Sequence, residues 1–291
     1  MSESPPTLDP RAAQRWLDRQ GQPSPWLHEE VGQRMAQRLE WIVAKPANWL
    51  SWHPALGGLD AETLVSQAYP QAQRFRQTGL GEPAVHAPEK GASPWWSPQR
   101  WRAAPTWPEA GVGLVWANMA LHTAPDPMAL LAHWHQSLAV DGFVMFSCLG
   151  PDTLRELRAL YARLGWGEPA HAFTDMHDWG DMLVQTGFAE PVMDMERIVL
   201  SFETPQRLLQ ELRELGRNLH VARFAGLRGR QWQAQLHREL ESLRSPQGGG
   251  PMTLTFEIVY GHAYKPTPRL KVAPQTSISL GEMRQQLQKR P

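Results

Sequence analysis

Polar side chains that could hold a small ligand follow two apolar runs in the middle of the chain. Asn118 and His122 come after the run at 112–116, and residues 147–151 close the run at 143–149. Amide, imidazole and hydroxyl groups suit the polar parts of a substrate or cofactor. If the two runs are parallel strands, these side chains share one edge of a sheet, which is where α/β proteins bind ligands.

The segment between the runs predicts that arrangement. Residues 127–138 carry apolar side chains at helical spacing, and Asp126 followed by Pro127 is a typical helix start. A strand, a helix and a strand joined by short turns place the strands parallel, so we predict an α/β fold. We expect strands at 47–52, 71–75, 84–86, 112–116, 143–149, 191–202 and 253–264, and helices at 10–19, 26–43, 60–69, 127–138, 153–164, 175–186, 205–216, 229–243 and 280–287.

Length and composition bound the class of protein. The 291 residues suffice for one large domain, and we predict a tail with a short helix at 1–25, a domain at 26–265 with a helical insert at 205–250, and a tail at 266–291. Positive and negative residues balance at 29 each, which gives no overall attraction to nucleic acid or to a membrane. No leader-like or membrane-spanning apolar run is visible, so we expect a cytoplasmic protein.

Cysteine and histidine usage argues against metal chemistry. The single cysteine, Cys148, excludes an intramolecular disulfide and lies within a predicted strand, so we expect a small buried core residue. His133 and His135 are two residues apart on a predicted helix and point to different faces. We therefore predict no metal site.

Several motifs in order resemble one enzyme family. The order of elements is similar to that of the class I S-adenosylmethionine-dependent methyltransferases. The motifs look like those of the malonyl-[acyl-carrier-protein] O-methyltransferases of biotin synthesis. They are WANMALH at 116–122, FSCLGPDTLREL at 146–157, DMHD at 175–178, GF at 187–188, PVMDME at 191–196, GLRGR at 226–230 and FEIVYGHA at 256–263. The resemblance implies a seven-stranded, mostly parallel Rossmann-like sheet with helices on both faces and a helical insert before the last strand.

The first predicted strand departs from the family pattern. In the family a glycine-rich loop after this strand lets S-adenosylmethionine approach the backbone, and an acid after the second strand holds the ribose. Here Trp52 and Pro54 stand where small residues are expected, and only Gly57 and Gly58 remain. Residues 74–77 contain no acid. The resemblance implies a cofactor site at Trp52, Gly57, Gly58, Asn118, Met119 and His122.

The resemblance implies that a carboxylate accepts the methyl group. Such an acceptor needs no general base, because a carboxylate is already ionised at pH 7. It needs orientation, to which a cation contributes. The resemblance points to Arg155, His177 and Arg223 as substrate-binding candidates. Ordinary alternatives are a solvated arginine for the first and last, and helix capping for residues 175–178.

The predicted insert is locally basic. Residues 205–244 hold eight arginines, no lysine and four glutamates. Such a face would attract an acidic acyl carrier protein, although two solvated amphipathic helices would look the same. Three functions therefore stay open. They are a methyltransferase acting on a malonyl carrier with a rewired cofactor site, a non-catalytic relative that serves as a binding or partner subunit, and a methyltransferase for another small carboxylate.

Overall fold

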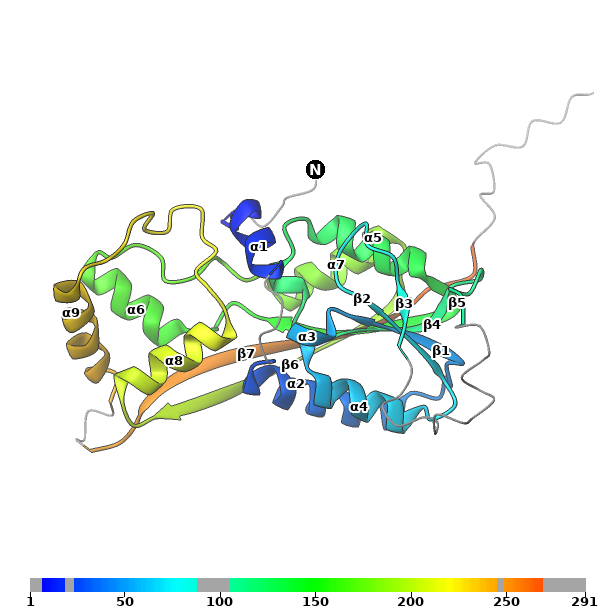
Figure 1. Ribbon diagram of the computed structural model, residues 1–291, viewed down its shortest axis with the longest axis horizontal. Helices are drawn as coiled ribbons and strands as arrows, with labels where there is room; N and C mark the ends of the chain where they lie inside the picture. Colours follow the sequence, from blue (N-terminus) through cyan, green and yellow to red (C-terminus); the bar gives the residue numbers. More distant parts are fainter. Residues whose placement is uncertain (1–6, 19–23, 88–104, 245–248, 269–291) are drawn as a thin grey trace, which may run out of the picture.

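One seven-stranded sheet forms the centre of the computed structural model, which describes residues 7–18, 24–87, 105–244 and 249–268 (Figure 1). The strand order is β3-β2-β1-β4-β5-β7-β6. The strands are β1 (Asn48–Trp52), β2 (Gln73–Gln77), β3 (Val85–His86), β4 (Val112–Ala117), β5 (Leu138–Leu149), β6 (Ala189–Phe202) and β7 (Met252–Tyr264).

The pairing of the strands confirms the predicted Rossmann-like sheet. β1 runs parallel to β2 and β4, and β4 runs parallel to β5. β7 is antiparallel to β5 and to β6, and the short β3 is antiparallel to β2. The four central parallel strands, β2, β1, β4 and β5, therefore bring their carboxyl ends to the same edge.

Helices cover both faces of the sheet, as predicted. In Figure 1, α2 and α4 lie below the sheet and α5 and α7 lie above it. The helical segments are α1 (Pro10–Leu17), α2 (Trp26–Gln37), the 3-10 turn η1 (Arg38–Trp41), α3 (Pro54–Gly57), α4 (Leu59–Ala68), the 3-10 turn η3 (Leu121–Thr123), α5 (Pro127–Ser137), α6 (Arg155–Leu164), α7 (Met176–Thr186), α8 (Pro205–Leu215) and α9 (Arg230–Glu241).

The side chains of β1 alternate between two cores because a strand presents successive residues to opposite faces. Trp49 packs with Leu27 and Met35 of α2 on one face. Leu50 and Trp52 pack with residues of α5 and α7 on the other. Cys148 is fully buried in this second core, which confirms its prediction as a core residue.

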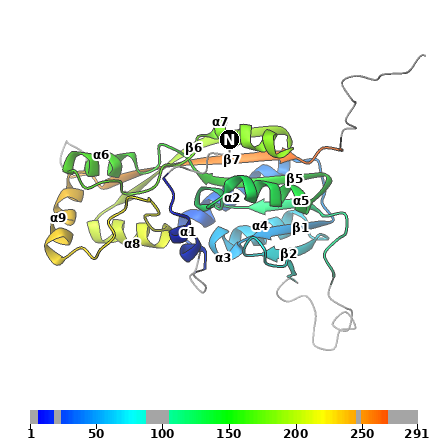
Figure 2. The ribbon, with the colours of Figure 1, turned by 90° about the horizontal axis from the view of Figure 1, so that it is seen from above.

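Long strands carry the insert at one end of the molecule. β6 and β7 are 14 and 13 residues long and extend past the other strands toward α8 and α9 (Figures 1 and 2). Leu208 of α8 and Leu236 of α9 are buried in the same core as Phe202 and Met252 of these strands. The insert thus packs on the sheet and shares its core.

Two boundaries differ from prediction in ways that affect the site. β2 begins and ends two residues later than expected, and β5 begins five residues earlier. β3 appears where a short strand was expected at 84–86, whereas residues 88–104 lie outside the described residues. The helix predicted at 280–287 also lies outside them. Within the described ranges, no helix combines the length and hydropathy needed to cross a bilayer.

Candidate functional site

A cavity of about 780 Å³ opens at the carboxyl ends of the parallel strands. Its walls come from the loop after β1, the loop after β2, the loop after β4 and the first residues of α5, with α1 contributing a further side. The residues that line it include Leu17, Trp52, His53, Gly57, Glu82, Asn118 and Thr123. The cavity lies where the Rossmann-like fold predicts a ligand.

The loop after β1 makes its sharp turn at His53. This residue adopts the left-handed conformation, with φ 48° and ψ 53°, which glycine usually supplies. His53 thus adds a position where a glycine would be expected, and the departure predicted at Trp52 and Pro54 stays a prediction. The imidazole is buried, its Nδ1 has no hydrogen-bond partner among the described residues, and burial lowers its pKa.

Trp52 does not close the cavity. Its indole packs against His133 and Trp134 of α5, with ring centroids 5.5 and 6.0 Å away. Because residues of a strand alternate, this side chain turns into the core of that face, and only part of it borders the cavity. The bulky indole therefore does not fill the cavity.

Helix α2 holds the loop between β1 and α4. The Nδ1 of His28 donates to the carbonyl of Leu56 at 2.7 Å, since a carbonyl can only accept. The carboxylate of Glu29 accepts from three backbone amides at the start of α4, those of Leu59 at 2.9 Å and of Asp60 and Ala61 at 3.1 Å. A carboxylate at a helix N-terminus is favourable for charge and for hydrogen bonding.

The two predicted glycines are required by this packing. A Cβ on Gly57 would lie 2.9 Å from the carbonyl oxygen of Asn118. Gly58 has φ +113°, and a Cβ there would lie 2.7 Å from the Glu29 carboxylate. Both residues position the loop, and Gly57 also lines the cavity.

Asn118 fixes the floor of the cavity and is fully engaged by protein. Its Nδ2 donates to the carbonyls of His28, at 2.7 Å, and Gly57, and its Oδ1 accepts from the Ser147 hydroxyl at 2.6 Å. The same hydroxyl accepts from the amide of Met119 at 2.9 Å. Asn118 and Met119 therefore offer mainly backbone and shape to a ligand.

An acid does follow β2, which corrects the sequence prediction. The prediction placed the strand two residues too early and considered only residues up to 77. In the structure, Glu82 lies in the loop after β2 and lines the cavity, and its carboxylate accepts from the Thr78 hydroxyl. The two glycines between Thr78 and Glu82 are typical of a turn, and this turn was the sequence signal that the strand ends there and that Glu82 follows it.

A second, smaller cavity of about 150 Å³ lies beyond η3. His122, predicted at the cofactor site, lines this cavity and not the larger one, whereas Thr123 borders both. His171 lies opposite, with its Nε2 2.9 Å from the carbonyl oxygen of His122. Sequence reasoning missed His171 because it sits in a loop between two helices, where no periodicity marks it.

The remaining predicted substrate residues line neither cavity. Arg155 is exposed and pairs with Asp152 and Glu156. His177 is exposed on the first turn of α7, where Asp175 caps the helix. Arg223 donates to Asp9 at 2.7 Å and ties the insert loop to the N-terminal segment. Their role in substrate binding stays a prediction.

This strand order, with a cavity at the carboxyl ends of the parallel strands, is the class I S-adenosylmethionine-dependent methyltransferase fold. A malonyl-[acyl-carrier protein] O-methyltransferase of Gallionella capsiferriformans (strain ES-2) is 37% identical over 256 residues, which cover 84% of this chain and 86% of that protein. One from Laribacter hongkongensis (strain HLHK9) is 36% identical over 255 residues, which cover 84% of each. The chain belongs to the malonyl-[acyl-carrier protein] O-methyltransferase family.

No family model matches the sequence. A solved 1,6-didemethyltoxoflavin-N1-methyltransferase from Burkholderia thailandensis is 19% identical, with a TM-score of 0.40, over 83% of this chain and 81% of that one.

Proposed function

We propose that this chain transfers a methyl group from S-adenosylmethionine to the free carboxylate of a malonyl group carried by acyl carrier protein. The observation that supports this most is the open cavity at the strand ends, which the Trp52 indole borders without filling. From the resemblance to the malonyl-[acyl-carrier-protein] O-methyltransferases, we also propose that the reaction belongs to biotin synthesis. A cytoplasmic location stays our expectation.

The residues around the larger cavity fit S-adenosylmethionine. The volume of about 780 Å³ lies within the range of cofactor sites. Glu82 supplies a carboxylate that suits the two ribose hydroxyls, and the loop at 53–57 supplies backbone for the methionine end. His53 is kept neutral at pH 7 by burial, so it adds no positive charge beside a sulfonium.

S-adenosylmethionine supplies an activated methyl group on a positively charged sulfur. The acceptor carboxylate is already ionised and attacks without a base. The oxygen–carbon bond forms as the sulfur–carbon bond breaks, and the electron pair leaves on sulfur. The protein's part is to hold the two reactants in line and to exclude water, so a site without an acid–base pair is sufficient.

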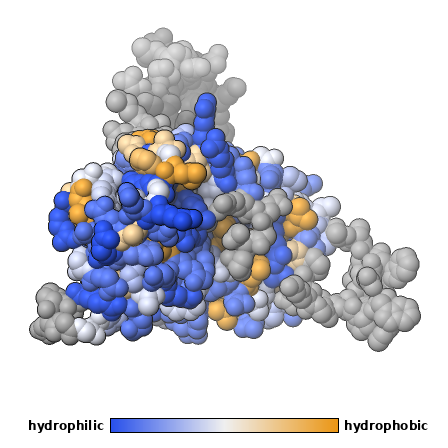
Figure 3. Space-filling view, turned by 60° about the vertical axis from the view of Figure 1, so that its left-hand side comes forward, coloured by the Kyte–Doolittle hydropathy of each residue, from blue (hydrophilic) through white to orange (hydrophobic). Residues whose placement is uncertain are grey.

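The basic insert is the proposed docking face for the carrier protein. Arg213, Arg230 and Arg238 are exposed and make no ion pair with any described residue. The loop between α8 and α9 adds the exposed apolar side chains Phe224 and Leu227. Figure 3 shows apolar residues along the upper part of this end of the molecule beside a largely hydrophilic surface. Exposed positive charges together with exposed apolar side chains suit an acidic partner.

Calorimetric titration with S-adenosylmethionine and S-adenosylhomocysteine tests the cofactor site. We expect dissociation constants in the micromolar range, about −8 kcal/mol. A methylation assay with malonyl carrier protein should then give a methyl ester detectable by mass spectrometry. If millimolar ligand produced no heat and the assay produced no methyl ester, these results would support the non-catalytic alternative instead.

A further inference from the structure

The smaller cavity contains two buried histidines with unused nitrogens. His122 and His171 are 8% and 4% exposed, and the Nδ1 of each has no hydrogen-bond partner among the described residues. A carbonyl only accepts, so the Nε2 of His171 carries the proton that it donates to His122. The Nδ1 of neutral His171 is therefore a buried lone pair. Such groups are rare and are costly unless something pairs with them.

Arg158 and Phe173 hold His171 in place. The guanidinium of Arg158 on α6 donates to the carbonyls of His171 at 2.7 Å and of Ala170 and Thr153 at 3.3 Å. Phe173 packs edge-on against His171, with centroids 4.7 Å apart. The imidazole thus has a defined position at the wall although one of its nitrogens is unpaired.

The size and position of the smaller cavity match a short acyl group whose carboxylate accepts the methyl group. In another protein, an apolar cavity of about this volume holds a benzene ring, so a three-carbon acid fits. Leu154, Leu157 and Phe256 give it apolar walls that suit a methylene group. Thr123 borders both cavities, so an occupant of the smaller one lies next to the larger one.

We propose that the smaller cavity is the acceptor subsite, where His122 and His171 bind the carboxylate of a short dicarboxylic thioester. This inference rests on the proposed function and adds the residues that select the acid. An incoming carboxylate favours the imidazolium form of His171, whose Nδ1 then donates to it. When the carboxylate becomes a neutral ester, that attraction is lost and the proton returns to solvent.

The charged surroundings keep His171 neutral until the acid arrives. Burial, with Arg158 and His220 nearby, lowers its pKa to about 4, and burial also lowers the pKa of His122 well below its usual 6.5. The groups that face His171 are Arg158 and its partner Glu168, His122, His220 and Arg217. Proton uptake on binding then follows from linkage, and affinity for the acid should fall by up to tenfold per pH unit above neutrality.

Binding of two thioesters tests this. With protein saturated in S-adenosylhomocysteine, malonyl-pantetheine and acetyl-pantetheine differ mainly in the carboxylate. We expect the wild type to prefer the malonyl probe at least tenfold, and His171→Phe and His122→Phe to reduce that preference toward one. His262→Phe is the matched control, because His262 also has a buried unpaired nitrogen yet lines neither cavity.

His171→Asn adds a readout that a structural role would not change. The amide still donates but cannot titrate, so part of the preference should remain while the pH dependence of malonyl binding disappears. A preference unchanged within twofold in both phenylalanine variants, or an unchanged pH slope in His171→Asn, would overturn the inference. Failure of the proposed function is separate: wild-type protein would then neither bind S-adenosylhomocysteine nor form methyl ester.

Discussion

The two cavities differ in how the protein satisfies the polar groups around them. Beside the larger cavity, Asn118, Glu29 and His28 bond to protein, and of the buried side-chain nitrogens and oxygens in its described lining only the His53 Nδ1 has no partner. Beside the smaller cavity, His122 and His171 both carry unpaired nitrogens. The first region is a scaffold whose shape is fixed by its own contacts, whereas the second keeps two buried histidine nitrogens without a partner among the described residues.

The largest expected effect comes from breaking the scaffold at Gly57. A side chain there meets the Asn118 backbone, so Gly57→Val must displace the loop. We expect S-adenosylhomocysteine affinity to fall by about 100-fold and stability by about 3 kcal/mol. Calorimetry and urea unfolding measure both. Gly229→Ala is the control, because nothing lies within 4 Å of a Cβ at Gly229.

A pH titration of stability tests how tightly α2 holds the loop. Burial lowers the pKa of His28 to about 4, so between pH 7 and pH 5 the unfolded chain binds a proton that the folded one does not. Stability is therefore present above the usual pKa of 6.5 and is lost as the pH falls, by about 2 kcal/mol for this residue. His28→Gln keeps a donor for Leu56 without titrating. Between pH 7 and pH 5, the unfolding free energy of this variant should fall by about 2 kcal/mol less than that of the wild type. A pH slope equal to that of the wild type would contradict the assignment of a lowered pKa to His28.

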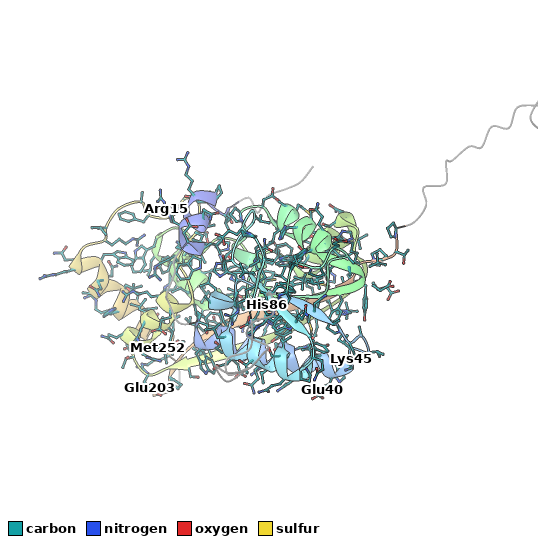
Figure 4. The ribbon with its side chains drawn as sticks, turned by 45° about the vertical axis from the view of Figure 1, so that its right-hand side comes forward. Arg15, Glu40, Lys45, His86, Glu203 and Met252 are labelled. Carbon is teal, nitrogen blue, oxygen red and sulfur yellow. The ribbon has the colours of Figure 1, made fainter. Side chains whose placement is uncertain are left out.

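The acid missed by sequence reasoning has a smaller expected effect. Glu82→Gln keeps the size of the side chain but removes the charge that suits ribose hydroxyls. We expect S-adenosylhomocysteine affinity to fall about tenfold. Glu40→Gln serves as the control, since Glu40 is exposed at the end of the molecule away from the insert (Figure 4). Equal effects of the two substitutions would remove Glu82 from the site.

The smallest effect concerns docking at the insert. Replacing Arg213, Arg230 and Arg238 by glutamate should lower kcat/KM for malonyl carrier protein about fivefold at low salt, less at high salt. Activity on malonyl-pantetheine should be unchanged. Lys45→Glu, on the opposite end from Glu203 and Met252 (Figure 4), is the control. A loss that is equal for both substrates would exclude a docking role.

The spacing of apolar residues predicted the helices and strands well, because each element buries one face and so needs apolar side chains at a regular interval. The helix at 127–137 and the strands at 112–117 and 252–264 fell within a few residues of their predicted limits, since their apolar spacing and Asp126 cap are local signals. The site was harder to predict. Glu29 and His171 act across the fold through contacts with Leu59 and His122 that no local pattern records. The error at Glu82 came from a shift of two residues in one short strand.

Helix α1 connects the two cavities physically. It lends Leu17 to the larger cavity and Trp16 to the smaller one, and the Asp9–Arg223 pair joins its start to the insert loop. A shift of α1 on binding at one cavity would therefore alter a wall of the other. Such coupling is reciprocal, so a carrier protein that settles α1 would tighten cofactor binding by the same factor as the cofactor tightens the carrier.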